Sequence, residues 1–86
     1  MAEPAGTVRV RFFAGARAAA GTPATDAERQ EGDLVADVLS RLARSRPALL
    51  AVLPACSFLL DGVRARTGDA VGGASELDVL PPFSGG

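Results

Sequence analysis

The chain has 86 residues and a formal net charge of −1, with 48% hydrophobic and 22% charged residues. This length predicts a single domain with a modest core. The near-neutral charge gives no electrostatic case for binding nucleic acid or an anionic membrane. No apolar run reaches the roughly 18 residues of a membrane span, and the first residues lack the pattern of a signal peptide. One cysteine allows no disulfide within the chain, so we expect a cytoplasmic protein.

Several residue types that carry enzyme chemistry are missing from the chain. It has no histidine, and its nine cationic residues are all arginine. These absences exclude Ser-His-Asp and Cys-His arrangements, a lysine Schiff base and the usual His/Cys zinc site. The carboxylates are scattered, and no phosphate-binding glycine motif occurs. We therefore predict a protein that is not catalytic alone and binds no metal or cofactor, and whose best candidate for chemistry is its C-terminal carboxylate.

Five segments of the chain predict β-strands. Three of them alternate apolar and polar residues clearly, which is the period of a half-buried strand. In the first, Val8, Val10 and Phe12 are expected to face the core, while Phe13 falls on the opposite face. The second is polar and suits a sheet edge. The strands are expected at residues 7–13, 22–30, 56–61, 63–66 and 76–80.

One long helix is predicted over residues 33–45, where apolar residues recur at helical spacing. Asp33 is the predicted N-cap, and a following proline ends the helix near Ser45. Asp37 and Arg41 are expected to form an i,i+4 ion pair. Two shorter turns are expected at residues 14–21 and 48–53.

The order of these elements predicts an α+β fold. The long helix can serve as the crossover between the first and last strands, which then pair in parallel. That arrangement is the β-grasp of ubiquitin-like domains, with a mixed sheet of four to five strands and one main helix packed on one face. We expect a flexible leader, the domain and an extended C-terminal tail at residues 1–6, 7–80 and 81–86.

The chain ends in Pro81-Pro82-Phe83-Ser84-Gly85-Gly86. Two prolines favour an extended path, and two glycines without Cβ atoms fit a slot too narrow for other residues. This sequence predicts an arm that presents the terminal carboxylate to another protein. The alternative is a frayed terminus without a function.

Three apolar side chains are expected near the base of this arm. If the first and last strands are neighbours, Phe13 and Leu80 emerge together on the sheet face away from the helix, and Leu59 shares that face. An exposed apolar group at this position predicts a docking surface for a partner. The alternative is that these are ordinary exposed residues, or that a loop covers them.

Two further sets of side chains leave more than one interpretation. Cys56 could accept sulfur as a persulfide, but its place in an apolar strand favours a small buried residue. Four arginines from two strands are expected to gather on the outer sheet face, either as solvated charges or facing an acidic partner. They are Arg9, Arg11, Arg64 and Arg66.

Two motifs carry a resemblance to a known family. The chain contains Phe12-Phe13-Ala14-x-x-Arg17 near its start and Leu80-Pro81-Pro82-Phe83-Ser84-Gly85-Gly86 at its end. With the long helix between them, residues 7–86 resemble the ubiquitin-like sulfur carriers, and most closely the small subunits of molybdopterin synthase. The related carrier of the thiazole pathway ranks second, because it generally lacks the paired prolines. Phe83 departs from the smaller aliphatic residue that is common in the family.

The resemblance implies a chemical role for the C-terminus. An ATP-using adenylyltransferase of the ubiquitin-activating kind would adenylate Gly86, with Gly85 as its slot-fitting neighbour, and a sulfur donor would convert the adenylate to a thiocarboxylate. The large synthase subunit, in a heterotetramer, would then use this sulfur to form the dithiolene of molybdopterin. Residues implied to contact these partners are Pro81, Pro82, Phe83, Ser84, Phe13, Leu80, Leu59 and Arg17.

Three other functions stay open at this point. The chain could be a ubiquitin-like protein modifier joined through Gly86, although without lysine it cannot form lysine-linked chains of itself. It could carry sulfur for thiamine, cysteine or a natural product. It could also be a plain β-grasp binding domain with an inert C-terminus.

Overall fold

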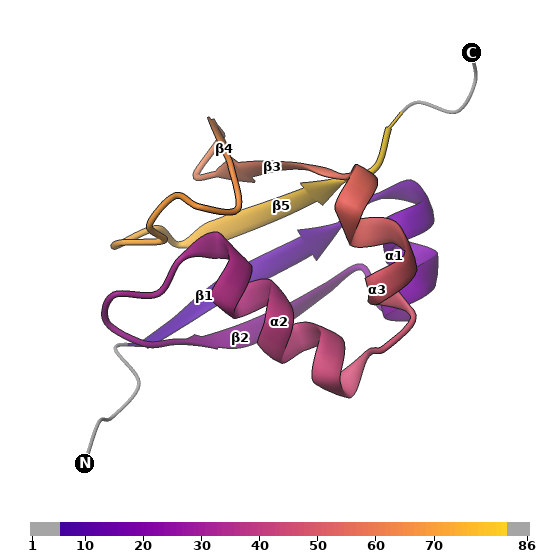
Figure 1. Ribbon diagram of the computed structural model, residues 1–86, viewed down its shortest axis with the longest axis horizontal. Helices are drawn as coiled ribbons and strands as arrows, with labels where there is room; N and C mark the ends of the chain where they lie inside the picture. The colour runs from indigo at the N-terminus through magenta and orange to yellow at the C-terminus, as the bar shows by residue number, and fades with distance from the viewer. Residues whose placement is uncertain (1–5, 83–86) are drawn as a thin grey trace.

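The computed structural model of the protein describes residues 6–82. These residues form a five-stranded sheet in the order β2-β1-β5-β3-β4. Helix α2 lies across one face of this sheet, and α1 and α3 lie together at the end where β1 and β5 finish (Figure 1). The strands are β1 (Gly6–Phe12), β2 (Ala24–Arg29), β3 (Ser57–Leu60), β4 (Val63–Ala65) and β5 (Glu76–Leu80). The helices are α1 (Ala14–Ala20), α2 (Val35–Ser45), α3 (Leu49–Val52) and the 3-10 turn η1 (Leu53–Ala55).

The two strands predicted to be parallel neighbours lie side by side in the middle of the sheet. Phe12 of β1 is opposite Val79 of β5 in a parallel pair. The other three pairs are antiparallel, between β1 and β2, β3 and β4, and β3 and β5. The predicted α+β arrangement and mixed sheet are therefore confirmed, with β2 at one edge as expected.

The core lies between the sheet and the helices. Residues predicted to face inward from the strands are buried, and Cys56 and Leu60 pack against the same cluster. Burial of these aliphatic and aromatic side chains is the main stabilising contribution in a domain of this size. The largest fully buried side chains are Phe12, Leu49, Leu77, Val8, Val10, Val35, Val38 and Val79.

The start of α2 differs from the prediction. The N-cap residue is Leu34, and the Asp37 carboxylate accepts a hydrogen bond of 2.7 Å from the Leu34 N–H. Asp33 instead accepts a bond of 2.8 Å from the Gln30 N–H and pairs with Arg41. The predicted Asp33 cap and the Asp37–Arg41 pair were therefore wrong, because Asp37 is engaged by the helix terminus and Arg41 reaches back to the preceding loop.

The remaining elements differ from the predicted bounds by small amounts. β1 begins at Gly6, one residue earlier than expected, because Gly6 pairs with Arg29 of β2. Ala14–Ala20 form a seven-residue helix that is capped by Gly21, whose φ of 78° is left-handed. Residues 48–53 form α3 and the beginning of η1. Within residues 6–82, no helix is long and apolar enough to cross a membrane.

Candidate functional site at the end of the central strand

The candidate site begins where β5 ends. The Phe13 N–H donates a hydrogen bond of 3.2 Å to the Val79 carbonyl, which extends the parallel pairing by one step. Because side chains alternate along a strand, this register places Phe13 beside Leu80 on the face away from α2. Both side chains are half-buried. Pro81 follows directly, so the C-terminal residues continue from the middle strand of the sheet.

Leu59 lies on the same face, one strand away. It is opposite Asp78 of β5 on one side and opposite Arg64 of β4 on the other. Ser57, two residues earlier in β3, is opposite Leu80. Leu59 and Leu80 are therefore diagonal neighbours, a distance that long side chains can bridge. We call Phe13, Leu80 and Leu59 the outer patch.

An ion pair that the sequence did not reveal lies next to the outer patch. Arg11 Nε and Nη2 donate to the two carboxylate oxygens of Asp78 at 2.7 and 2.9 Å. The Asp78 side chain is only 8% exposed although it points away from the helices, while that of Arg11 is 42% exposed. Asp78, through its hydrogen bonds and its charge, raises the pKa of the Arg11 guanidinium. The two-pronged geometry holds the guanidinium plane in one orientation.

This ion pair also places the Arg11 guanidinium beside the Phe13 ring of the outer patch. The Arg11 guanidinium carbon lies 5.7 Å from the centre of the Phe13 ring, within the range of a cation–π contact. Arg11 therefore connects the buried charge of Asp78 to the half-buried ring of Phe13. A partner that docks on Phe13 would meet a preformed surface of ring and guanidinium.

The expected cluster of four arginines was wrong. β1 and β4 are separated by β5 and β3, so their arginines lie on different parts of the face. Arg9 pairs with Asp26 of β2 at 3.5 Å, and Arg11 pairs with Asp78. The outer face near β1 therefore alternates positive and negative groups, and Arg64 lies near the opposite edge of the sheet.

Arg17 lies on α1, one turn after Phe13, and its side chain is exposed. Its backbone carbonyl accepts the Gly21 N–H at 2.9 Å, while its guanidinium has no hydrogen bond or ion pair with any residue between 6 and 82. Because α1 contacts β5, Arg17 is positioned at the same end of the sheet as the outer patch. Arg17 is therefore near the outer patch, but it is not part of it.

Cys56 is half-buried just before β3. Its thiol donates a hydrogen bond of 3.2 Å to the Val52 carbonyl, and burial raises its pKa. A raised pKa disfavours the thiolate that sulfur chemistry needs, which supports the structural interpretation. Among residues 6–82, no group of three or more His, Cys, Asp or Glu side chains is arranged to hold a metal ion.

The sequence predicted which residues share the outer face, but not the buried charge among them. Arg11 and Asp78 are 67 positions apart, and only the exact parallel register brings them together. Their shared outward position on neighbouring strands was the available signal. Phe83, Ser84, Gly85 and Gly86 lie outside the described residues.

Comparisons with known proteins agree with this geometry. Residues 10–86 match the ThiS family. A molybdopterin synthase sulfur carrier subunit from Chlamydomonas reinhardtii is 32% identical over 81 residues, which cover 92% of this chain and 98% of that protein.

Three solved structures with similar folds are the following. SAMP1 from Haloferax volcanii is 28% identical, with a TM-score of 0.83 over 94% of this chain and all of that one. Small archaeal modifier protein 1 from Methanosarcina acetivorans is 31% identical, with a TM-score of 0.75 over 94% and 97% of the two chains. A putative molybdopterin converting factor subunit 1 from Pyrococcus furiosus has a TM-score of 0.80 over 92% of this chain and 100% of that one. Because it is only 18% identical, this likeness supports the fold alone.

The sheet order, the helical crossover and these likenesses confirm the predicted ubiquitin-like β-grasp fold. With a family match over residues 10–86 and a relative at 32% identity, the chain belongs to the ThiS family, which confirms the predicted membership of the ubiquitin-like sulfur carriers.

Proposed function

We propose that this chain is the sulfur-carrying small subunit of a molybdopterin synthase-type complex, and that it is not catalytic alone. The observation that carries the proposal is the position of the outer patch. Phe13 and Leu80 lie side by side at the point where β5 passes into Pro81 and the C-terminal residues. A partner that docks on this patch is therefore beside the segment that leads to Gly86.

The proposed chemistry takes place on the Gly86 carboxylate. An activating enzyme forms the acyl-adenylate from ATP with release of pyrophosphate. Hydrosulfide released by a sulfur donor then attacks the acyl carbon, so a C–S bond forms while the C–O bond to AMP breaks, and AMP and one proton leave. The thiocarboxylate that results is delivered to a large synthase subunit, where its sulfur enters the dithiolene of molybdopterin. This chain holds no cofactor in the scheme, because ATP is used by the activating enzyme.

Roles for individual residues follow from this proposal. Gly86 is the reacting residue, and Gly85 lets the enzyme backbone approach it. Pro81, Pro82, Phe83 and Ser84 form the segment that enters each partner. The outer patch provides apolar contact area, and buried aromatic and aliphatic contacts of this kind contribute most to affinity at interfaces. Arg17 is exposed at the same end of the sheet, where a partner's acidic group could pair with it.

Intact-mass spectrometry tests the chemistry directly. The purified chain is incubated with its cognate activating enzyme, ATP and a sulfur donor. We expect a mass gain equal to the exchange of one oxygen for one sulfur, located at Gly86 by fragmentation. A variant without Gly85 and Gly86 should show no gain. An unchanged mass with an activating enzyme that is active on another carrier would overturn the proposal.

A second function is favoured by the likeness to two archaeal proteins named as modifiers. In that role the activated Gly86 would form an amide with a lysine of a target protein. The two roles share the adenylation step and differ in the acceptor. Mass spectrometry of denatured cell extracts separates them, because a modifier leaves Gly-Gly remnants on target lysines after digestion at a suitable site, whereas a dedicated carrier leaves none.

A further inference from the structure

A second surface lies on the helix side of the sheet, away from the outer patch. An apolar groove with a volume of about 240 Å³ runs between α2, η1 and β3. Leu39 and Ala43 form its wall on α2, and Phe58 lies in its floor. Leu50, which also lines the groove, is 64% exposed.

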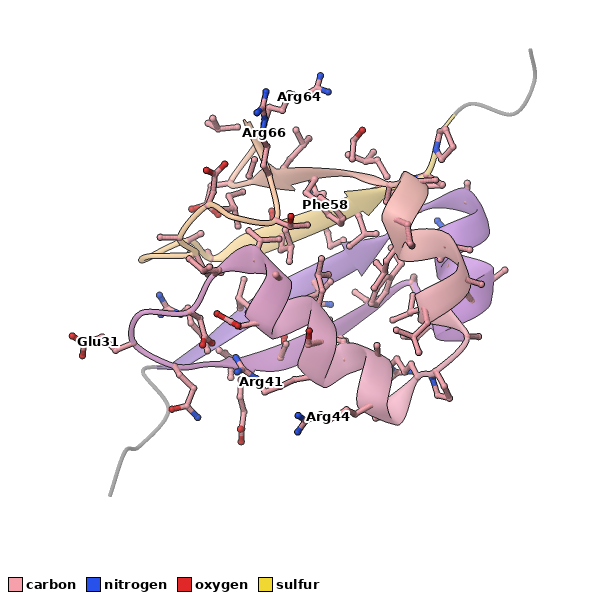
Figure 2. All side chains as sticks on the ribbon, in the orientation of Figure 1. Glu31, Arg41, Arg44, Phe58, Arg64 and Arg66 are labelled. Carbon is pink, nitrogen blue, oxygen red and sulfur yellow. The ribbon has the colours of Figure 1, made fainter. Side chains whose placement is uncertain are left out.

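The groove continues to the edge of the sheet. It shares Leu53, Pro54 and Phe58 with a second hollow of about 480 Å³. This hollow is lined by Arg64 and Arg66, from the end of β4 and the residue after it. Figure 2 shows the two guanidinium groups together at this edge, with Phe58 deeper in the molecule. We call the combined surface the edge groove.

Backbone groups are open to pairing along the edge groove. β4 is the last strand of the sheet, and it ends at Ala65, opposite Phe58. Ser57 of β3 pairs with Leu80 on one side and, among residues 6–82, has no strand partner on the other. Edge positions of this kind accept an added extended segment.

The positive charge of Arg64 and Arg66 beside the groove favours an acidic segment. Within the described part of the chain, Arg64 and Arg66 form no ion pair, whereas Arg9, Arg11 and Arg41 each have a carboxylate partner. Asp69 lies nearby, but its carboxylate accepts the backbone N–H of Arg66 at 2.8 Å and does not engage the guanidinium. Two unpaired cations beside an apolar channel are complementary to acidic groups beside apolar side chains.

We propose that the edge groove binds an extended segment of a partner protein in which apolar residues are flanked by aspartate or glutamate. The apolar side chains fill the channel beside Leu50 and Phe58, and the carboxylates face Arg64 and Arg66. The apolar channel lies on the helix side of the sheet and Phe13 and Leu80 emerge on the other side, while Arg64, opposite Leu59, lies on the edge strand β4. The segment therefore binds while the C-terminal end is engaged elsewhere. This site does not depend on the proposed sulfur chemistry.

A defined peptide tests the proposal. The probe is fluorescein-labelled Asp-Asp-Leu-Val-Leu-Asp-Asp, titrated with the full chain and followed by fluorescence anisotropy and by amide chemical shifts. We expect saturable binding with a Kd on the order of 100 µM or tighter, since a short segment gives a small interface. Shifts should centre on Leu50, Phe58 and Arg64. Affinity should fall as salt rises, because the charges are exposed.

Two variants and a matched control decide the outcome. Arg64→Glu combined with Arg66→Glu should weaken binding at least about 10-fold, and Leu50→Ser should weaken it by about 3-fold. Arg44→Glu changes another exposed arginine, on α2, that does not line the groove, and it should leave the affinity within about 2-fold. All four substituted residues are exposed, so folding should be retained.

Several results would contradict the edge groove as the site. They are no detectable binding, equal binding of a peptide with lysine in place of aspartate, or equal loss from Arg44→Glu. Shifts that centre on Phe13 and Leu80 would move the site to the outer patch. Sedimentation that shows the chain pairing with itself through Leu50 would identify a second copy as the occupant and would also overturn the proposal.

Discussion

Two arginine–aspartate pairs lie at different places in the fold, and their surroundings differ. Arg11 and Asp78 connect β1 and β5, which are already joined by backbone hydrogen bonds, and the guanidinium continues to the Phe13 ring. Arg41 and Asp33 connect α2 to the loop before it. The aspartate side chains are almost equally covered, at 8% and 9% exposure.

The second pair joins more of the chain than the first. Besides Arg41, the Asp33 carboxylate accepts the Gln30 N–H, and the Asp33 carbonyl accepts the Val71 N–H at 2.9 Å. Arg41 also donates to the Glu28 carbonyl at 3.0 Å. Asp33 thus connects β2, the start of α2 and the loop before β5. We infer that the Asp33 pair mainly stabilises the fold, whereas the Arg11 pair mainly shapes the outer patch.

The largest expected effect comes from removing the outer patch itself. Phe13→Ala with Leu80→Ala should lower the efficiency of adenylation by the cognate activating enzyme about 10- to 100-fold, as loss of central apolar contacts does at other interfaces. ATP–pyrophosphate exchange measures this efficiency. Val63→Ala is the matched control, because Val63 is 69% exposed on β4, away from Leu80. An equal loss in both variants would contradict the special role of the patch.

Asp33→Asn should lower the stability of the fold and leave adenylation nearly unchanged. It removes the charge that pairs with Arg41 and weakens the bond to Gln30, so the free energy of unfolding should fall by about 1–3 kcal/mol. Urea denaturation measures this change, and adenylation by the folded variant should stay within about 2-fold of the wild type because the outer patch is untouched. The control is Asp26→Asn, which removes a pair with Arg9 whose side chains are 56% and 63% exposed. That exposed pair should contribute less than about 1 kcal/mol.

Asp78→Asn tests whether the Arg11–Asp78 pair both stabilises the fold and shapes the outer patch. An amide has one acceptor oxygen and an NH2 donor in place of the second oxygen, so it cannot form the two-oxygen fork, and Arg11 loses its fixed orientation beside Phe13. We expect a loss of about 1 kcal/mol in unfolding free energy and a drop in adenylation efficiency of about 3-fold. Arg11→Lys keeps the charge but loses the planar fork, and it should reproduce the drop in adenylation efficiency. If Asp78→Asn lowers only stability, the pair has no part in presenting the patch.

Local periodicity is the reason that most of the fold could be predicted. Alternation identified β1 and β5 and the inward positions of Val8 and Val10, and helical spacing identified α2. The predicted helix between the first and last strands of the chain then allowed these two strands to pair in parallel. From that pair the closeness of Phe13 and Leu80 followed, before any contact was known.

What could not be predicted depends on strand order and on long side chains. The four outward arginines were expected together because strand order across the sheet is not encoded in the local pattern. The partners of Arg11 and Arg41 were missed for a related reason: a flexible guanidinium reaches several carboxylates, and register and loop path decide which one. The edge groove had no sequence signal, since it exists only where β4 stops short of the start of β3.

The smallest expected effect is a difference in acid stability between the two pairs. Hydrogen bonding to Arg41 lowers the pKa of Asp33 from its ordinary value of 3.8. The unfolded chain therefore binds a proton at Asp33 before the folded chain does, so the stability from this group is fully present above about pH 5 and is lost as pH falls through the lowered pKa. The gap in unfolding free energy between the wild type and Asp33→Asn should be constant from neutral pH to about pH 5 and should shrink below it. All other carboxylates are common to both proteins, so their titration cancels in the gap. A gap that stays constant, or widens, as pH falls below the ordinary Asp33 value would contradict the stabilising role of the charged pair.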